Sequence, residues 1–152
     1  MDGSLLTGSE LSSWRGMLVT HSVLIAHLDE ELEREVGIPL SAYEVLMYLG
    51  DADGGKLRMG ELADRLLLSR SGITRLVDRL VRQGLIVRER CTDDGRGLYA
   101  RLTPTGRRKL DRARPVHLAG VRRHFLAHLD ESERASMGAL WERILSAERR
   151  AV

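Results

Sequence analysis

The fold is decided by residues 62–110, LADRLLLSRSGITRLVDRLVRQGLIVRERCTDDGRGLYARLTPTGRRKL, whose hydrophobic period changes after Gly84. Between Ser69 and Gly84, apolar residues recur every three or four positions, which is the period of an amphipathic helix. Serine is a favoured helix N-cap and glycine often follows the last helical turn, so these two residues mark the expected ends of the helix. The side chains predicted to face the core are Ile73, Leu76, Val77 and Leu80.

After Gly84 the period becomes two, which is the period of a β-strand. We expect strands over residues 85–91 and 98–102, joined by a turn at residues 93–95, Asp-Asp-Gly. In the second strand, one face should carry Leu98, Ala100 and Leu102. A β-hairpin therefore follows the helix.

The residues before this helix predict two further short helices, over residues 41–50 and 60–67, with a brief strand at residues 57–58 between them. Two short helices joined by a tight turn and followed by a β-hairpin form a winged helix-turn-helix. We assign it to residues 41–103.

Long amphipathic helices are expected on both sides of this region, over residues 10–36 and within residues 104–149. Pro115 should kink the second stretch rather than end it, because apolar positions continue to Leu129. The predicted fold class is mainly α with a small β-hairpin, in one domain of residues 1–152. Capping boxes are predicted for Thr7 with Glu10, Ser41 with Glu44, and Asp130 with Glu133.

Basic charge is concentrated in the middle of the chain, although the formal net charge of all 152 residues is only +2. Residues 1–55 carry ten acidic residues and two arginines, a local charge of −8. Residues 56–114 carry 14 arginines and two lysines against seven acidic residues, a local charge of +9. A segment this basic indicates a polyanion as partner.

The helix over residues 69–83 is the expected recognition helix, because its N-terminal half is polar and basic. In a helix-turn-helix this half reads base edges in the major groove, and later cations meet phosphates. Asp78 is expected to orient one of these later cations. The alternative is that these side chains form an ordinary solvated helix surface. The candidate DNA-binding residues of the helix are Ser69, Arg70, Ser71, Thr74, Arg75, Arg79 and Arg82.

The hairpin tip adds a candidate contact at Arg96, which has a glycine on each side. A cation on a narrow tip suits the strongly negative potential of a narrow minor groove, and Asp94 can brace it. The alternative is an ordinary loop cation.

In order and spacing, residues 62–110 resemble the DNA-binding core of the MarR family of bacterial transcriptional regulators. The flanking long helices match as well, so the resemblance covers nearly the whole chain. Gly60 departs from the pattern, because the family often has a polar cap near this position. The matching motifs are Leu62-Ala63, Ser69, Thr74-Arg75, Asp78-Arg79-Leu80, Gly84-Leu85, Asp94-Gly95-Arg96 and Leu102-Thr103-Pro104-Thr105-Gly106.

This resemblance implies an obligate homodimer with intertwined first and last helices, two winged lobes, and an effector pocket where each lobe meets the dimer region. Such a dimer should bind a pseudo-palindrome in double-stranded DNA with half-sites about 10 base pairs apart. The wide apolar faces of the terminal helices agree with self-association. Trp14, His21 and Tyr43 are candidates to line a pocket for a small aromatic or phenolic effector; packing at the dimer seam is the alternative.

Histidine and cysteine allow two further hypotheses. His117, His124 and His128 are spaced to share a helix face and could bind zinc, although ordinary surface or interface roles are favoured. Cys91 lies next to Arg90, which could lower the pKa of its thiol and make it reactive. The alternative, which is favoured, is a structural role. We expect no cofactor.

Two functions compete: a ligand-responsive repressor, and a winged-helix module that binds an acidic protein without specific DNA binding. An enzyme is not expected, because residues 53–56, Asp-Gly-Gly-Lys, lack the P-loop spacing and no catalytic triad is apparent. The apolar runs are far shorter than the roughly 20 residues of a membrane span. Without a secretory signal and with one cysteine, the chain is expected in the cytoplasm.

Overall fold

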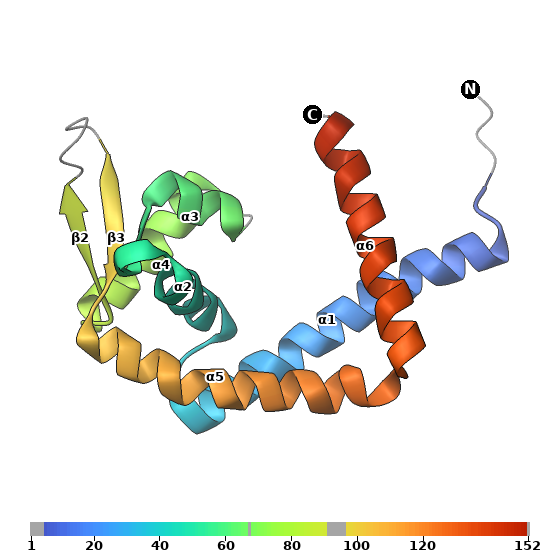
Figure 1. Cartoon of the computed structure of the whole chain (residues 1–152), viewed down its shortest axis with the longest axis horizontal. Coiled ribbons are helices and arrows are strands. Elements are labelled where there is room, and N and C mark those ends of the chain that lie inside the picture. Colours follow the sequence, from blue (N-terminus) through green and yellow to red (C-terminus); the bar gives the residue numbers. More distant parts are fainter. Residues whose placement is uncertain (1–4, 67, 91–96, 152) are drawn as a thin grey trace. The chain divides into compact units, whose positions relative to one another are not determined.

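The computed structural model describes residues 5–66, 68–90 and 97–151, and it divides into two compact units. We call residues 28–117 the lobe, and residues 1–27 with 118–152 the helical unit. Two long helices, α1 (Gly8–Val36) and α5 (Pro104–His124), each contribute to both units (Figure 1).

The lobe contains the expected winged helix-turn-helix. Its two strands β2 and β3 pair as predicted, but β1 also pairs with β3, so the sheet has three antiparallel strands in the order β1-β3-β2 (Figure 1). The elements between α1 and α5 are α2 (Leu40–Asp51), η1 (Asp53–Gly55), β1 (Lys56–Arg58), α3 (Met59–Arg65), α4 (Arg70–Arg82), β2 (Ile86–Arg90) and β3 (Leu98–Leu102).

The lobe is organised around the apolar stripe of α4. The four side chains predicted for this stripe are all buried, none more than 6% exposed. Ala100 of β3 is fully buried, as expected, but Leu98 is 42% exposed. Leu98 pairs with Arg90 at the end of the hairpin farthest from α5, so it extends past the core. Other members of the core are Leu32, Leu46, Leu49, Leu62, Ile86 and Leu110.

The Leu-Thr-Pro-Thr-Gly motif joins β3 to α5. Thr103 Oγ1 donates to the Gly84 carbonyl at 2.7 Å and accepts from the Gly106 amide at 3.0 Å. A Cβ atom at residue 106 would collide with the Leu85 carbonyl oxygen, so only glycine lets α5 approach this closely. The motif therefore fixes the start of α5 against the turn after α4.

Two of the three predicted capping boxes are present. Thr7 with Glu10 and Asp130 with Glu133 each exchange side-chain to backbone hydrogen bonds. The box predicted for Ser41 and Glu44 is wrong, because α2 begins at Leu40.

The Leu40 amide donates instead to Asp29 Oδ1 of α1 at 2.6 Å. The acceptor thus comes from 11 residues upstream, which a local motif cannot reveal.

The helical unit consists of the first two-thirds of α1, the end of α5, η2 (Leu126–His128) and α6 (Glu131–Ala151). Helix α5 continues through Pro115 as predicted, but it ends at His124 rather than near Leu129. The backbone of Phe125 leaves the helical region, with φ −124° and ψ −64°, and starts a short 3-10 turn. None of the described helices is long and apolar enough to cross a membrane.

Candidate nucleic-acid interface

Helix α4 carries three of its four arginines on the side opposite its buried stripe. At 100° per residue, Arg75, Arg79 and Arg82 share one face, and all three are exposed. Ser71 lies on the same face and is exposed as well. The helix therefore packs with one side and presents arginines with the other.

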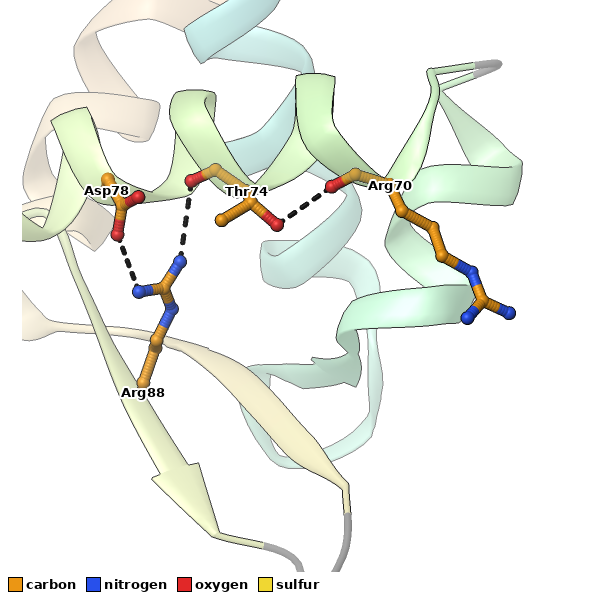
Figure 2. A network of polar contacts seen from close by, with 4 residues as sticks. All are labelled: Arg70, Thr74, Asp78 and Arg88. Atoms are coloured by element: carbon orange, nitrogen blue, oxygen red, sulfur yellow. Dashed lines mark hydrogen bonds and ion pairs between the residues drawn. The ribbon is translucent and has the colours of Figure 1, made fainter.

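The N-terminus of α4 is organised by hydroxyl groups. Ser69 Oγ accepts from the Gly72 amide at 3.1 Å, which confirms its predicted role as N-cap, and it lies 3.2 Å from Ser71 Oγ. Thr74 Oγ1 donates to the Arg70 carbonyl at 2.8 Å. The Arg70 side chain extends away from the helix (Figure 2). A helix N-terminus with exposed polar groups is suited to a phosphate or a base edge.

Asp78 was expected to orient a later arginine of its own helix, and this expectation is wrong. Its Oδ1 accepts from Arg88 Nη1 of β2 at 2.5 Å, and Arg88 Nη2 donates to the Thr74 carbonyl at 3.4 Å (Figure 2). Arg88 reaches α4 because it alternates with Val87 on β2 and points inward like buried Ile86. A cation that points inward from a strand needs a partner of opposite charge. The position of Arg88 on β2 was therefore the feature of the sequence that could have indicated this ion pair.

The sheet beneath the hairpin tip is held by ion pairs and ring contacts. Arg101 Nε donates to Glu89 Oε1 at 2.6 Å, and its Nη1 donates to the Gly54 carbonyl at 2.9 Å. The Lys56 ammonium lies 4.7 Å from the centre of the Tyr99 ring. The tip itself, with the predicted contacts Asp94 and Arg96 and with Cys91, lies outside the described residues.

A groove of about 660 Å³ runs beside α4, between the start of α3 and the part of the hairpin that carries Arg88 and Leu98. Cations and acids both line it, including Arg70 and Arg88 on one side and Glu61 and Asp64 on the other. The Arg58 amide donates to Glu61 Oε2 at 3.1 Å, so Glu61 caps α3 near Gly60, where the sequence lacks a polar cap.

The three candidate effector residues belong to different units: Trp14 and His21 to the helical unit, and Tyr43 to the lobe. Tyr43 is buried in the lobe, its ring 4.5 Å from that of His117. His21 lines an apolar cavity of about 920 Å³ in the helical unit, between α1 and α6. Trp14 is 52% exposed and does not line this cavity.

The histidines are distributed over both units. His124 lies in the helical unit with its ring 4.8 Å from that of His27, whereas His117 belongs to the lobe. Burial lowers the pKa of His117 and raises the pKa of Tyr43 beside it. Among the residues that the structure describes, no group of three His, Cys, Asp or Glu side chains is placed to hold a metal ion.

An arginine-faced second helix with an adjoining hairpin defines a winged helix-turn-helix DNA-binding protein. Comparison with known proteins supports the same class. Residues 36–97 match the model of the MarR family. The HTH-type transcriptional repressor YetL of Bacillus subtilis is 30% identical over 121 residues, which are 78% of this chain and 72% of YetL.

Two further comparisons give the same result. The uncharacterized HTH-type transcriptional regulator YkoM of Bacillus subtilis is 37% identical over 71 residues, about half of each chain at 47% and 46%. The crystal structure of Sco3205, a MarR family transcriptional regulator from Streptomyces coelicolor, in complex with DNA, superposes with a TM-score of 0.91 at 32% identity. That match covers 96% of this chain and 91% of Sco3205.

The chain therefore belongs to the MarR family. It is a DNA-binding transcriptional regulator and not an enzyme.

Proposed function

We propose that this protein is a repressor that binds a pseudo-palindromic operator in cytoplasmic DNA as a homodimer. The observation that carries the proposal is the exposed arginine face of α4, opposite a fully packed stripe. A face of this kind can enter a major groove without disturbing the core, and bidentate arginine contacts read guanine there. The similarity to the repressor YetL supports the direction of regulation.

The homodimer is supported by the apolar surface of the helical unit. None of its described apolar side chains is buried, and large ones such as Trp14, Leu18, Trp141 and Leu145 are 38–55% exposed. Full burial of one such side chain is worth about 1.5–3 kcal/mol. A second copy that contributes the same helices would cover both surfaces at once, as an isologous interface does.

The ligand response is the finer part of the proposal. The cavity between α1 and α6 shares Leu18 and Trp141 with the apolar surface of the helical unit, so a second copy would cover its opening. Its apolar wall is interrupted by His21 and Glu133, which are groups that can orient an aromatic ligand. Of the three residues first considered, His21 is the one retained. A ligand that favours one spacing of the two lobes would shift the DNA-binding equilibrium by its differential affinity.

DNase footprinting on the DNA upstream of the protein's own gene tests the repressor directly. We expect one protected region with two half-sites about 10 base pairs apart, and an affinity that falls steeply with salt. A protein-binding module would show only weak binding without sequence preference. In that case the operator proposal fails.

Titration with 4-hydroxybenzoate tests the ligand response. We expect it to raise the Tm of the wild type and to lower operator affinity, and we expect His21→Ala to reduce both effects. A series of aromatic and phenolic acids with no effect on either quantity would contradict this part.

A further inference from the structure

A small polar network joins β2, the first strand of the wing hairpin, to the recognition helix α4. Arg88 of β2 donates to Asp78 Oδ1 at 2.5 Å and to the Thr74 carbonyl at 3.4 Å, and the Thr74 hydroxyl donates to the Arg70 carbonyl at 2.8 Å (Figure 2). The guanidinium group thus bridges two successive turns of α4 from a neighbouring strand.

Arg88 is directed into the protein, unlike the arginines of the α4 face. Its side chain is 29% exposed, and no described residue accepts a hydrogen bond from its buried Nε. Water is therefore partly excluded from one side of the guanidinium, which strengthens its attraction to Asp78. A side chain held in this way cannot also extend to a phosphate without breaking its contacts to α4.

The charge of Asp78 also indicates an internal role for Arg88, because a negative charge near the DNA-facing surface is unfavourable for binding DNA. Asp78 lies beside the arginine face of α4, about 60° around the helix from Arg75, and its side chain is 38% exposed. A carboxylate there repels phosphates unless a cation neutralises it. Arg88 provides that charge through its Nη1, while its Nη2 donates to the Thr74 carbonyl, so the guanidinium makes a two-pronged contact with α4.

We propose that Arg88 is a positioning residue: together with Asp78 it fixes β2, and with it the wing, at the angle to α4 that DNA binding requires. This proposal rests on the proposed operator binding. It states that an internal ion pair sets the angle between α4 and β2 at which the protein binds its operator. Arg88 itself makes no DNA contact. Losing either partner leaves the wing free to move relative to α4, so that the two no longer match adjacent grooves together.

The sign of one effect separates this proposal from simple electrostatics. Asp78→Asn removes a negative charge that faces DNA, so electrostatics alone predicts tighter binding. The positioning role predicts the opposite, a loss of about tenfold in operator affinity, within the range measured for coupled residues in contact. Affinity would be measured by fluorescence anisotropy on the footprinted duplex, with circular dichroism to show that each variant is folded.

Four further variants complete the experiment. We expect Arg88→Gln to lose a similar factor, and the double variant with Asp78→Asn to lose no more than either single one. Arg88→Lys should also lose most of the affinity, because an ammonium group cannot make the two-pronged contact, and it tests the proposal even if Asp78→Asn fails to fold. Arg90→Gln, on the exposed end of β2, measures the loss caused by removing any cation from this strand.

Tighter or unchanged binding by Asp78→Asn would overturn the proposal, and so would additive losses in the double variant. Near-normal binding by Arg88→Lys would show that Arg88 is a simple phosphate contact. A wild-type protein that leaves no footprint would instead contradict the operator proposal, so the two failures are distinguishable.

Discussion

The lobe and the helical unit differ in where their apolar side chains lie. Every buried apolar side chain among the described residues belongs to the lobe, between Leu28 and Ala113. The helical unit has two tryptophans, and both are more than a third exposed. The lobe therefore has a core of its own, whereas the helical unit exposes a broad apolar surface, which is the surface we propose for the homodimer.

The largest expected effect is the loss of packing inside the lobe. Leu80→Ala removes a side chain that is 0% exposed, so we expect the free energy of unfolding to fall by about 2–5 kcal/mol. The control Leu98→Ala, at a position 42% exposed, should change it by no more than about 0.5 kcal/mol. Urea unfolding followed by circular dichroism measures both. Equal losses would mean that the α4 stripe is not the core.

A charge on the apolar face of the helical unit should affect association more than folding. We expect Trp141→Glu to shift the protein from dimer to monomer and to lower operator affinity by about a hundredfold, because a monomer binds only one half-site at a time. Ser146→Glu places the same charge on the opposite face of α6 and should leave the dimer intact. Sedimentation velocity measures the mass, and a Trp141→Glu dimer would show that α6 is not the interface.

Within the lobe, the helix and the wing should contribute differently to DNA recognition. We expect Arg75→Ala to lower operator affinity by about 1–3 kcal/mol and to relax the preference at one base position. Arg96→Ala should weaken binding to all sequences alike and reduce the salt slope by about 1. Binding assays on operator variants at several salt concentrations measure both. The assignment of base reading to α4 is wrong if both variants keep the wild-type sequence preference.

The smallest expected effect concerns pH and the contact between buried Tyr43 and half-buried His117. Burial holds the pKa of His117 below its ordinary value of 6.5, so the unfolded chain takes up a proton first as the pH falls. His117 thus stabilises the fold fully above that value and progressively less below it.

We expect the Tm to fall less between about pH 7.5 and 5.5 in His117→Phe than in the wild type, since phenylalanine keeps the ring contact and cannot be protonated. The raised pKa of Glu44 acts in the opposite direction, but it is common to both proteins and cancels. Parallel melting curves would exclude His117 as the cause.

Features with short-range causes could be predicted from the sequence. The stripe of α4, its Ser69 cap and the pairing of β2 with β3 follow from residues close together along the chain. The order of motifs along residues 62–110 also indicates the family. Cap prediction failed at α2, where the acceptor Asp29 belongs to a different helix.

Only the tertiary structure decided which distant groups meet. From the sequence we expected Asp78 to interact with an arginine of its own helix. Packing of β2 against α4 instead places Arg88 Nη1 2.5 Å from Asp78 Oδ1. Packing also buried Tyr43 inside the lobe, and it left large apolar side chains of α1 and α6 exposed. The reason is physical: periodicity and capping depend on neighbours within about one helical turn, but an ion pair or an open apolar face depends on how whole elements dock.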